Sequence, residues 1–131
     1  MVALESAELF RNLKPNELRA LRQVTLEREF MNGQEIFRQG DPGDGVYLVK
    51  TGQVEISGLM SQGARSVFSQ IGPGGLFGEM AVIELRTRSA TATAVKDTTA
   101  YFIPRGELLS LIERSPGLAF DEREQIGRAH V

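Results

Sequence analysis

One segment of fifteen residues, 77–91, combines the residue types best suited to binding a small anion. It reads Phe-Gly-Glu-Met-Ala-Val-Ile-Glu-Leu-Arg-Thr-Arg-Ser-Ala-Thr. Gly78 lets the backbone approach a ligand closely, and the apolar run after Glu79 can form a helical turn whose first amides lack intrahelical partners. Arg88 can offer a planar fork to two phosphate oxygens. The segment therefore predicts an anion of nucleotide size as the ligand.

The carboxylate of Glu79 has the wrong charge to contact a phosphate. We expect it instead to accept a hydrogen bond from a sugar hydroxyl, with Arg88 nearby to hold it ionised. Taken separately, Glu79 is equally well explained as a carboxylate at a helix start, and Arg88 as a solvated charge at a strand end. Their combination at this spacing after Gly78 favours a binding site.

The same residues resemble a known motif. Residues 77–83 followed by 88–91 are similar to the phosphate-binding cassette of cyclic nucleotide-binding domains, the family of protein kinase A regulatory subunits, cyclic nucleotide-gated channels and the catabolite activator protein. Residues 40–49 and 52–56 resemble the glycine-marked hairpin of that family. The resemblance extends over about residues 4–119, nearly the whole chain.

The resemblance implies a role for each matching position. Glu79 would bind the ribose 2′-hydroxyl and Arg88 the cyclic phosphate, and the predicted ligand-binding set is Gly78, Glu79, Met80, Ala81, Arg88, Ser89 and Ala90. Many members of the family have proline where this chain has Thr87, and the loss of that ring should loosen the turn. Arg86 is a second basic group that can compete for the phosphate, although a solvated loop charge is the favoured interpretation.

The sequence says less about which residues contact the base and which base is bound. Val67 and Ser69, on the strand before the glycine-rich turn, are candidates for the base pocket, with ordinary barrel lining as the alternative. Phe120 and Arg123 are candidates for a lid that stacks on the base or makes a cation–π contact; a frayed tail is the alternative. The expected ligand is cAMP or cGMP, and family prevalence alone favours cAMP. No cofactor is expected.

Composition narrows the function classes. A length of 131 residues suits a single domain spanning 1–131. The chain has no cysteine and one histidine, His130, which makes a zinc or iron site improbable. A net charge of −2 argues against nucleic-acid binding by this chain. Without a membrane-length apolar run or a signal-peptide start, we expect a cytoplasmic protein that does not bind a membrane.

Periodicity predicts the elements that position the cassette. Apolar residues at helical spacing indicate N-terminal helices over about 3–23 and C-terminal helices over about 104–125. Between them, alternation and regular glycine turns predict a barrel over about 24–103. Its expected strands are 25–30, 34–38, 45–50, 53–58, 65–71, 89–95 and 98–103, with the cassette helix at 79–85. The predicted fold is mainly β, a double-stranded β-helix (jelly-roll) barrel flanked by short N- and C-terminal α-helices.

The preferred function is a sensor or regulatory domain in which cassette closure moves the C-terminal helices. Three alternatives compete with it. One is the sensor fragment of a transcription factor, because many bacterial members of the family that it resembles carry a winged helix after the barrel. No basic recognition helix is present here, so we expect no DNA binding by this chain alone. Another is a degenerate barrel that lacks a ligand and serves as a protein-interaction module. A cupin-type enzyme is disfavoured because it needs several histidines, so we expect no enzymatic activity. The output partner is unknown, and a homodimer is compatible with the sequence.

Overall fold

A computed structural model describes residues 10–11, 13–59, 63–83 and 86–114. These residues form three helices and eight strands. In chain order they are α1 Pro15–Val24, β1 Leu26–Phe30, β2 Glu35–Phe37, β3 Gly45–Thr51, β4 Val54–Leu59, β5 Arg65–Ile71, β6 Leu76–Phe77, α2 Glu79–Ile83, β7 Thr91–Ala94, β8 Thr98–Pro104 and α3 Arg105–Arg114. No helix in these ranges is long and apolar enough to cross a membrane.

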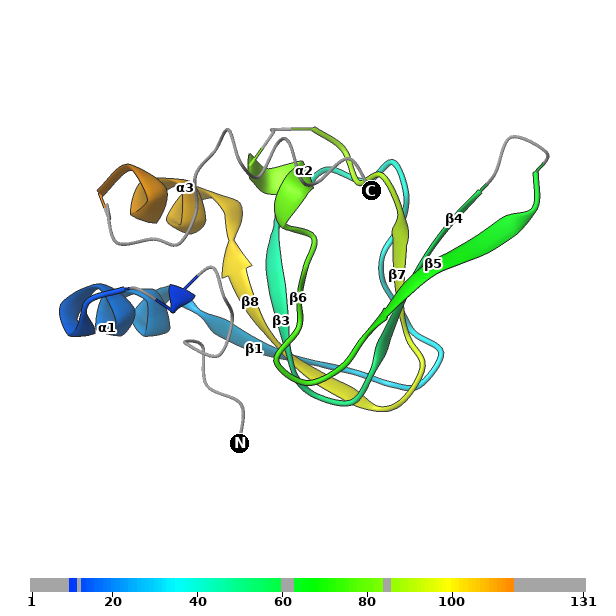
Figure 1. Cartoon of the computed structure of the whole chain (residues 1–131), viewed down its shortest axis with the longest axis horizontal. Coiled ribbons are helices and arrows are strands. Elements are labelled where there is room, and N and C mark those ends of the chain that lie inside the picture. The colour runs from blue at the N-terminus through cyan, green and yellow to red at the C-terminus, as the bar shows by residue number, and fades with distance from the viewer. Residues whose placement is uncertain (1–9, 12, 60–62, 84–85, 115–131) are drawn as a thin grey trace.

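The strands form two antiparallel four-stranded sheets that face each other (Figure 1). One sheet has the order β1-β8-β3-β6 and the other β2-β7-β4-β5. Neighbouring strands are therefore mostly distant in sequence, as in a jelly roll. The predicted fold class is confirmed.

Alternation along β3 explains how one strand serves two cores. Tyr47 and Val49 point into the barrel, where they join Phe77 and Phe102 in a buried apolar cluster. Val46 and Leu48 point to the opposite face, because successive side chains of a strand alternate, and they belong to a second cluster shared with the helices. All four β3 side chains are buried, which fixes the strand register.

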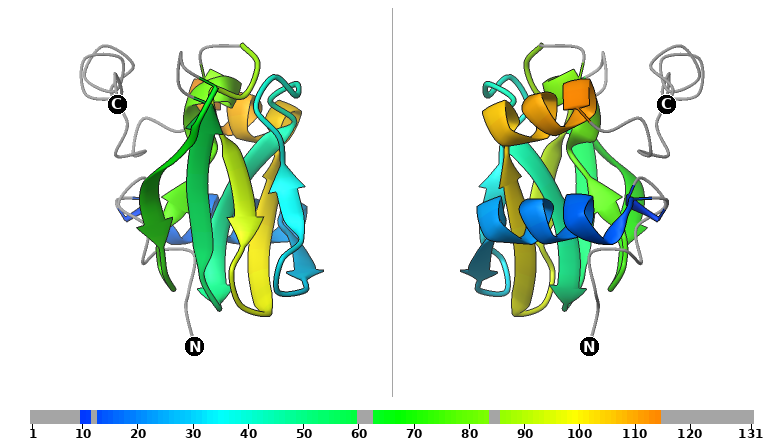
Figure 2. Two further views of the ribbon diagram at one scale, coloured as in Figure 1. Left: turned by 90° about the vertical axis from the view of Figure 1, so that its right-hand side faces the viewer. Right: turned by 90° about the vertical axis from the view of Figure 1, so that its left-hand side faces the viewer.

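The second cluster forms where α1 and α3 cover the outer face of the β3–β8 sheet (Figure 2). Pro15 occupies the first turn of α1, where a missing N–H costs nothing, and Glu17 Oε1 accepts a hydrogen bond from the Lys14 backbone N–H at 2.9 Å. Leu108 and Leu111 of α3 are buried in this cluster together with Val82 of the cassette helix. A single core thus joins α3 to α2.

Some predicted boundaries need correction. Strand β6, Leu76–Phe77, is not among the strands expected from the sequence. The strand expected at 89–95 begins only at Thr91. The N-terminal helix predicted at 3–11 lies largely outside the described residues, as does any helix after Arg114.

Candidate functional site

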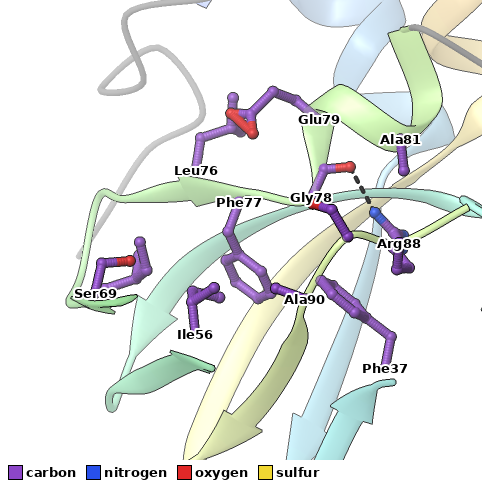
Figure 3. A pocket seen from close by; sticks show the side chains of 12 residues that line it. Phe37, Ile56, Ser69, Leu76, Phe77, Gly78, Glu79, Ala81, Arg88 and Ala90 are labelled. Atoms are coloured by element: carbon purple, nitrogen blue, oxygen red, sulfur yellow. Dashed lines mark hydrogen bonds between the residues drawn. The ribbon is translucent and has the colours of Figure 1, made fainter. Parts of the chain in front are cut away.

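A cavity of about 200 Å³ opens at the cassette end of the barrel (Figure 3). Its wall combines cassette backbone, one buried cation, one carboxylate and apolar strand residues. The residues that line it are Phe37, Ile56, Ser69, Ile71, Leu76, Phe77, Gly78, Glu79, Ala81, Arg88, Ser89 and Ala90. Six of the seven predicted ligand-binding residues are in this set; the seventh, Met80, lies in α2 between Glu79 and Ala81.

Arg88 is the only charged residue of the core among the described residues, with a side chain that is 1% exposed. Its Nη1 donates a hydrogen bond of 2.5 Å to the carbonyl oxygen of Gly78. Gly78 has φ +82°, and a Cβ at this position would lie 2.6 Å from the same Nη1. Glycine is therefore required here both by the left-handed backbone and by the proximity of the guanidinium.

The other terminal nitrogen of Arg88 binds the loop between β2 and β3. Nη2 donates to Asp44 Oδ1 at 2.9 Å and to the Gly45 carbonyl oxygen at 2.6 Å. Asp44 is 57% exposed although its partner is buried. The Arg88 Nε is buried and has no hydrogen-bond partner. One donor of this cation is thus left without an acceptor, which is unusual for a buried polar atom.

Backbone contacts fasten the arginine segment to the same loop. The Gly40 N–H donates to the Arg88 carbonyl oxygen at 2.8 Å, and the Arg88 N–H donates to the Asp41 carbonyl oxygen at 2.7 Å. Next to these two bonds, Pro42 and Thr87 form an isolated antiparallel β-bridge. The turn that we expected to be loosened by Thr87 is therefore held by pairing with a distant loop rather than by a proline ring.

Glu79 lies on the other side of Gly78 from Arg88, and Figure 3 shows its side chain extending away from the guanidinium. Burial raises the pKa of Glu79 above its ordinary value, while a hydrogen bond from its own backbone N–H and the charge of Arg88 act in the opposite direction. Arg88 thus favours the ionised form of Glu79, as expected, but burial has the larger effect on its pKa.

Of the two candidates for the base pocket, Ser69 and Val67, only Ser69 lines the cavity. Ser69 lines the cavity beside Ile56, with which it is paired. A bulge then shifts the register, so that Val67 pairs with Ser57 instead. Since a one-residue shift turns a side chain to the other face, Val67 is 53% exposed and is not among the lining residues. The structure does not bring Val67 to this site.

Three further candidates were expected, Arg86, Phe120 and Arg123. Arg86 is exposed and is not among the residues that line the cavity. The proposed lid residues Phe120 and Arg123 lie outside the described residues. Sequence reasoning missed two contributors, Asp44 and Phe37, because both contact Arg88 across long sequence separations. The only available signal was their position in and just before the glycine-marked loop.

Comparison with known proteins agrees with this geometry. Residues 27–115 match the model of the cyclic nucleotide-binding domain. The chain is 36% identical over 116 residues to the cyclic AMP receptor protein of Thermus thermophilus, covering 88% of this chain and 54% of the relative. It is 32% identical over 105 residues to the cAMP-dependent protein kinase regulatory subunit of Dictyostelium discoideum, covering 78% of this chain and 32% of the relative.

Solved structures give the same result. The Thermus thermophilus catabolite activator protein superposes with a TM-score of 0.76 at 37% identity, covering 82% of this chain and 51% of that one. The cAMP-bound regulatory domain of Toxoplasma gondii PKA superposes with a TM-score of 0.79 at 28% identity, covering 82% and 41%. The chain spans about half the length of the curated receptor protein that it matches. By its sequence, its fold and its cassette, the chain belongs to the cyclic nucleotide-binding domain family.

Proposed function

We propose that this chain binds a cyclic nucleotide in the cavity, with the phosphate against Arg88 and the ribose beside Glu79. The observation that supports this most directly is the buried guanidinium whose Nε–H lacks an acceptor. A buried donor without a partner is costly, by about 1–3 kcal/mol. A phosphate oxygen would satisfy that donor and compensate the charge of the cation in the same step.

The phosphate would be surrounded by backbone as well as by Arg88. Gly78, Ala81, Ser89 and Ala90 all line the cavity. Helix α2 has only five residues, so individual amides rather than a helix dipole would bind the anion. Asp44, which is more than half exposed, can turn into solvent when the phosphate replaces it as the counter-charge of Arg88.

The ribose would be recognised through Glu79. A 2′-hydroxyl can donate to the ionised carboxylate, and this bond offsets the burial that raises the pKa of Glu79. A ligand without that hydroxyl would leave a partly desolvated carboxylate unpaired. The proposed role of Glu79 is therefore selection of ribose over deoxyribose.

The base would lie toward β5. A volume of about 200 Å³ is below the roughly 300–1,000 Å³ of typical ligand pockets, and it suits the sugar and phosphate better than the whole nucleotide. Ile56, Ser69 and Ile71 form the strand side of the cavity, where a base can rest on apolar surface. We favour cAMP over cGMP because the two relatives described above are a cyclic AMP receptor and a cAMP-dependent kinase subunit.

Isothermal titration with cAMP, cGMP and 5′-AMP tests the proposal. We expect one saturable site for cAMP, weaker binding of cGMP, and still weaker binding of 5′-AMP, whose open phosphate lacks the ring constraint. Absence of binding by all three at millimolar concentration would contradict the proposal and favour the interpretation of a barrel that has lost its ligand and binds a protein.

A regulatory role would require that the ligand changes an equilibrium between two conformations. The proposed route is the shared core in which Val82 of α2 packs with Leu108 and Leu111 of α3. Inward movement of α2 on phosphate binding would repack that contact and shift α3. The chain would then act as a sensor domain without catalysis, for example as the sensor part of a transcription factor.

Hydrogen exchange with and without cAMP tests this coupling. We expect slower exchange in residues 77–91 and also in α3, because the movement of α2 is transmitted through Val82. Protection confined to 77–91, with exchange in α3 unchanged, would leave a binding domain without this switch.

A further inference from the structure

The ring of Phe37 covers one face of the Arg88 guanidinium. The guanidinium carbon lies 4.1 Å from the centre of this ring, which is within the range of a cation–π contact. Phe37 also borders Gly78, since a Cβ on Gly78 would lie 3.3 Å from Phe37 Cε2. One side chain therefore supports both the cation of the cassette and the backbone to which that cation is hydrogen-bonded (Figure 3).

Phe37 is itself held in place by the barrel interior. It is the last residue of β2 and pairs with Ala92 of β7. Its ring packs against Tyr47 and Phe77 at centroid distances of 5.9 and 6.0 Å, and Tyr47 stacks on Phe77 at 5.1 Å with an interplanar angle of 12°. Such a cluster has little freedom to rearrange, so it provides a fixed support for the guanidinium.

Two of the three acceptors of Arg88 do not have this property; the third, the Gly45 carbonyl oxygen, belongs to β3. Gly78 belongs to the cassette, and Asp44 lies in the β2–β3 loop with its carboxylate more than half exposed. Under the proposed function, both the cassette and the counter-charge are expected to move when ligand enters. Phe37 lies on a sheet strand outside both segments. It can therefore hold the guanidinium of Arg88 in one orientation while the hydrogen-bond acceptors of Arg88 change.

We infer that Phe37 is a positioning residue for ligand binding: its ring fixes the plane of the Arg88 guanidinium so that the unpartnered Nε–H is kept for the anion. This inference rests on the proposed function for its ligand, but the positioning itself exists without ligand. Nη1 and Nη2 each have at least one acceptor, and Nε is the guanidinium nitrogen without one. A bulky apolar side chain without a π face would fill the space but would not attract the cation.

Two kinds of variant separate this role from packing. Phe37→Leu removes the ring, whereas 3,5-difluoro- and 3,4,5-trifluorophenylalanine at position 37 keep its size and progressively weaken its attraction for a cation. The matched control is the same fluorination at Phe30, which joins the same aromatic cluster through Tyr47 at 6.3 Å and is not among the residues that line the cavity.

The ligands in the binding experiment are cAMP and adenosine, which has the same base and sugar but no phosphate. We expect Phe37→Leu to lower cAMP affinity about tenfold, equivalent to about 1.4 kcal/mol, with smaller stepwise losses in the fluorinated series. Adenosine affinity should stay within a factor of two, and the Phe30 series should change neither. Unchanged cAMP affinity in Phe37→Leu, or an equal loss for adenosine, would overturn the inference.

A second measurement decides the question even if the wild type binds no nucleotide. The Nε–H resonance of Arg88 in the ligand-free protein should be displaced by the ring current of Phe37. It should move toward the position of a free arginine in Phe37→Leu and stay unchanged in the Phe30 control. An Arg88 resonance unaffected by Phe37→Leu would contradict the positioning role, whereas failure of cAMP to bind would contradict only the proposed function.

Discussion

The barrel has a cavity at each end, and the larger of the two is not the one at the cassette. The cavity at the far end measures about 330 Å³ and is lined by Glu29, Phe30, Met31, Thr51, Asp97, Thr98 and Thr99. The cavity at the cassette end is smaller, at about 200 Å³. The far end presents two carboxylates and no basic side chain in its lining, whereas the cassette end has a buried guanidinium. Charge, rather than volume, distinguishes the end suited to an anion.

The surroundings of two arginines, Arg28 and Arg88, differ in the same way. Arg28 lies 3.7 Å from the centre of the Phe102 ring and donates to the Tyr47 hydroxyl at 3.3 Å. It is half-buried and does not border the cassette cavity. Arg88 also lies over an aromatic ring, but it adds three oxygen acceptors and an unpartnered donor. A cation over a ring is thus a common structural contact; Arg88 differs in being almost fully buried beside the cassette and in having a nitrogen without an acceptor.

The largest expected effect comes from removing Arg88. Arg88→Ala should lower cAMP affinity about 30- to 1,000-fold, because it removes a charge-assisted bond to the phosphate worth about 2–4 kcal/mol. Arg88→Lys should recover only part of this, since an ammonium cannot bind two oxygens in one plane.

Arg28→Ala is the matched control, since it also removes a guanidinium from an aromatic ring. It should leave cAMP affinity within about twofold, the change expected for a contact worth under 1 kcal/mol to the ligand. Titration calorimetry on both variants, with thermal unfolding to verify folding, makes the comparison. Equal losses in the two would mean that Arg88 has no specific role in binding the anion.

The next effect concerns the counter-charge of Arg88. Asp44→Asn keeps the shape but removes the charge that faces a buried cation, and we expect a loss of about 1–2 kcal/mol in the free energy of unfolding, reduced by the exposure of Asp44. The same variant should gain more thermal stability from cAMP than the wild type gains, because the phosphate restores the missing charge.

The control for Asp44 is Glu35→Gln, which breaks the exposed pair between Arg38 Nε and Glu35 Oε1 at 2.5 Å. Exposed pairs contribute little, so urea unfolding should not distinguish it from the wild type. If Asp44→Asn behaves in the same way, the Asp44–Arg88 pair has no special role at the cassette end.

A smaller effect is expected for the sugar. Glu79→Gln should weaken binding of cAMP about tenfold, near 1.4 kcal/mol, and should barely change binding of 2′-deoxy-cAMP, which has no hydroxyl for the carboxylate. Competition binding with both ligands measures the difference. An equal loss for the two would show that Glu79 acts through local structure, and circular dichroism of the variant identifies a folding defect.

The smallest effect is the pH dependence that Glu79 imposes on stability. Burial raises its pKa above the ordinary value of 4.5, so the folded state binds the proton more tightly than the unfolded state. The resulting stabilisation is complete below about pH 4.5 and is lost as pH rises through the folded-state pKa. The stability of the wild type should therefore fall relative to Glu79→Gln over that range in urea unfolding. A rise instead would mean that Arg88 dominates over burial.

Much of this structure could be predicted from sequence, and the exceptions have physical causes. Glycine turns and alternation located most strands, but β6 consists of Leu76 and Phe77 only, too short to show a period of two. Its pairing with Tyr47 and Leu48 is what makes it a strand. Glycine in the stretch before it favoured a turn instead.

The cassette residues were predictable because they are close together in the sequence, whereas their partners are not. Asp44 and Phe37 contact Arg88 from another loop and another strand, and no local pattern specifies such pairing. The misplaced Val67 has a related cause: the bulge in β5 breaks simple alternation, so a residue two positions from Ser69 turns to the other face.

The most direct test of the contrast between the two ends is a titration of ¹⁵N-labelled protein with cAMP, followed by amide chemical shifts. The account predicts that the largest shifts fall on Gly78, Ala81, Ser89 and Ala90, with Asp97 and Thr98 at the far end unaffected. Shifts centred on residues 29–31 and 97–99, with the cassette amides unmoved, would contradict it.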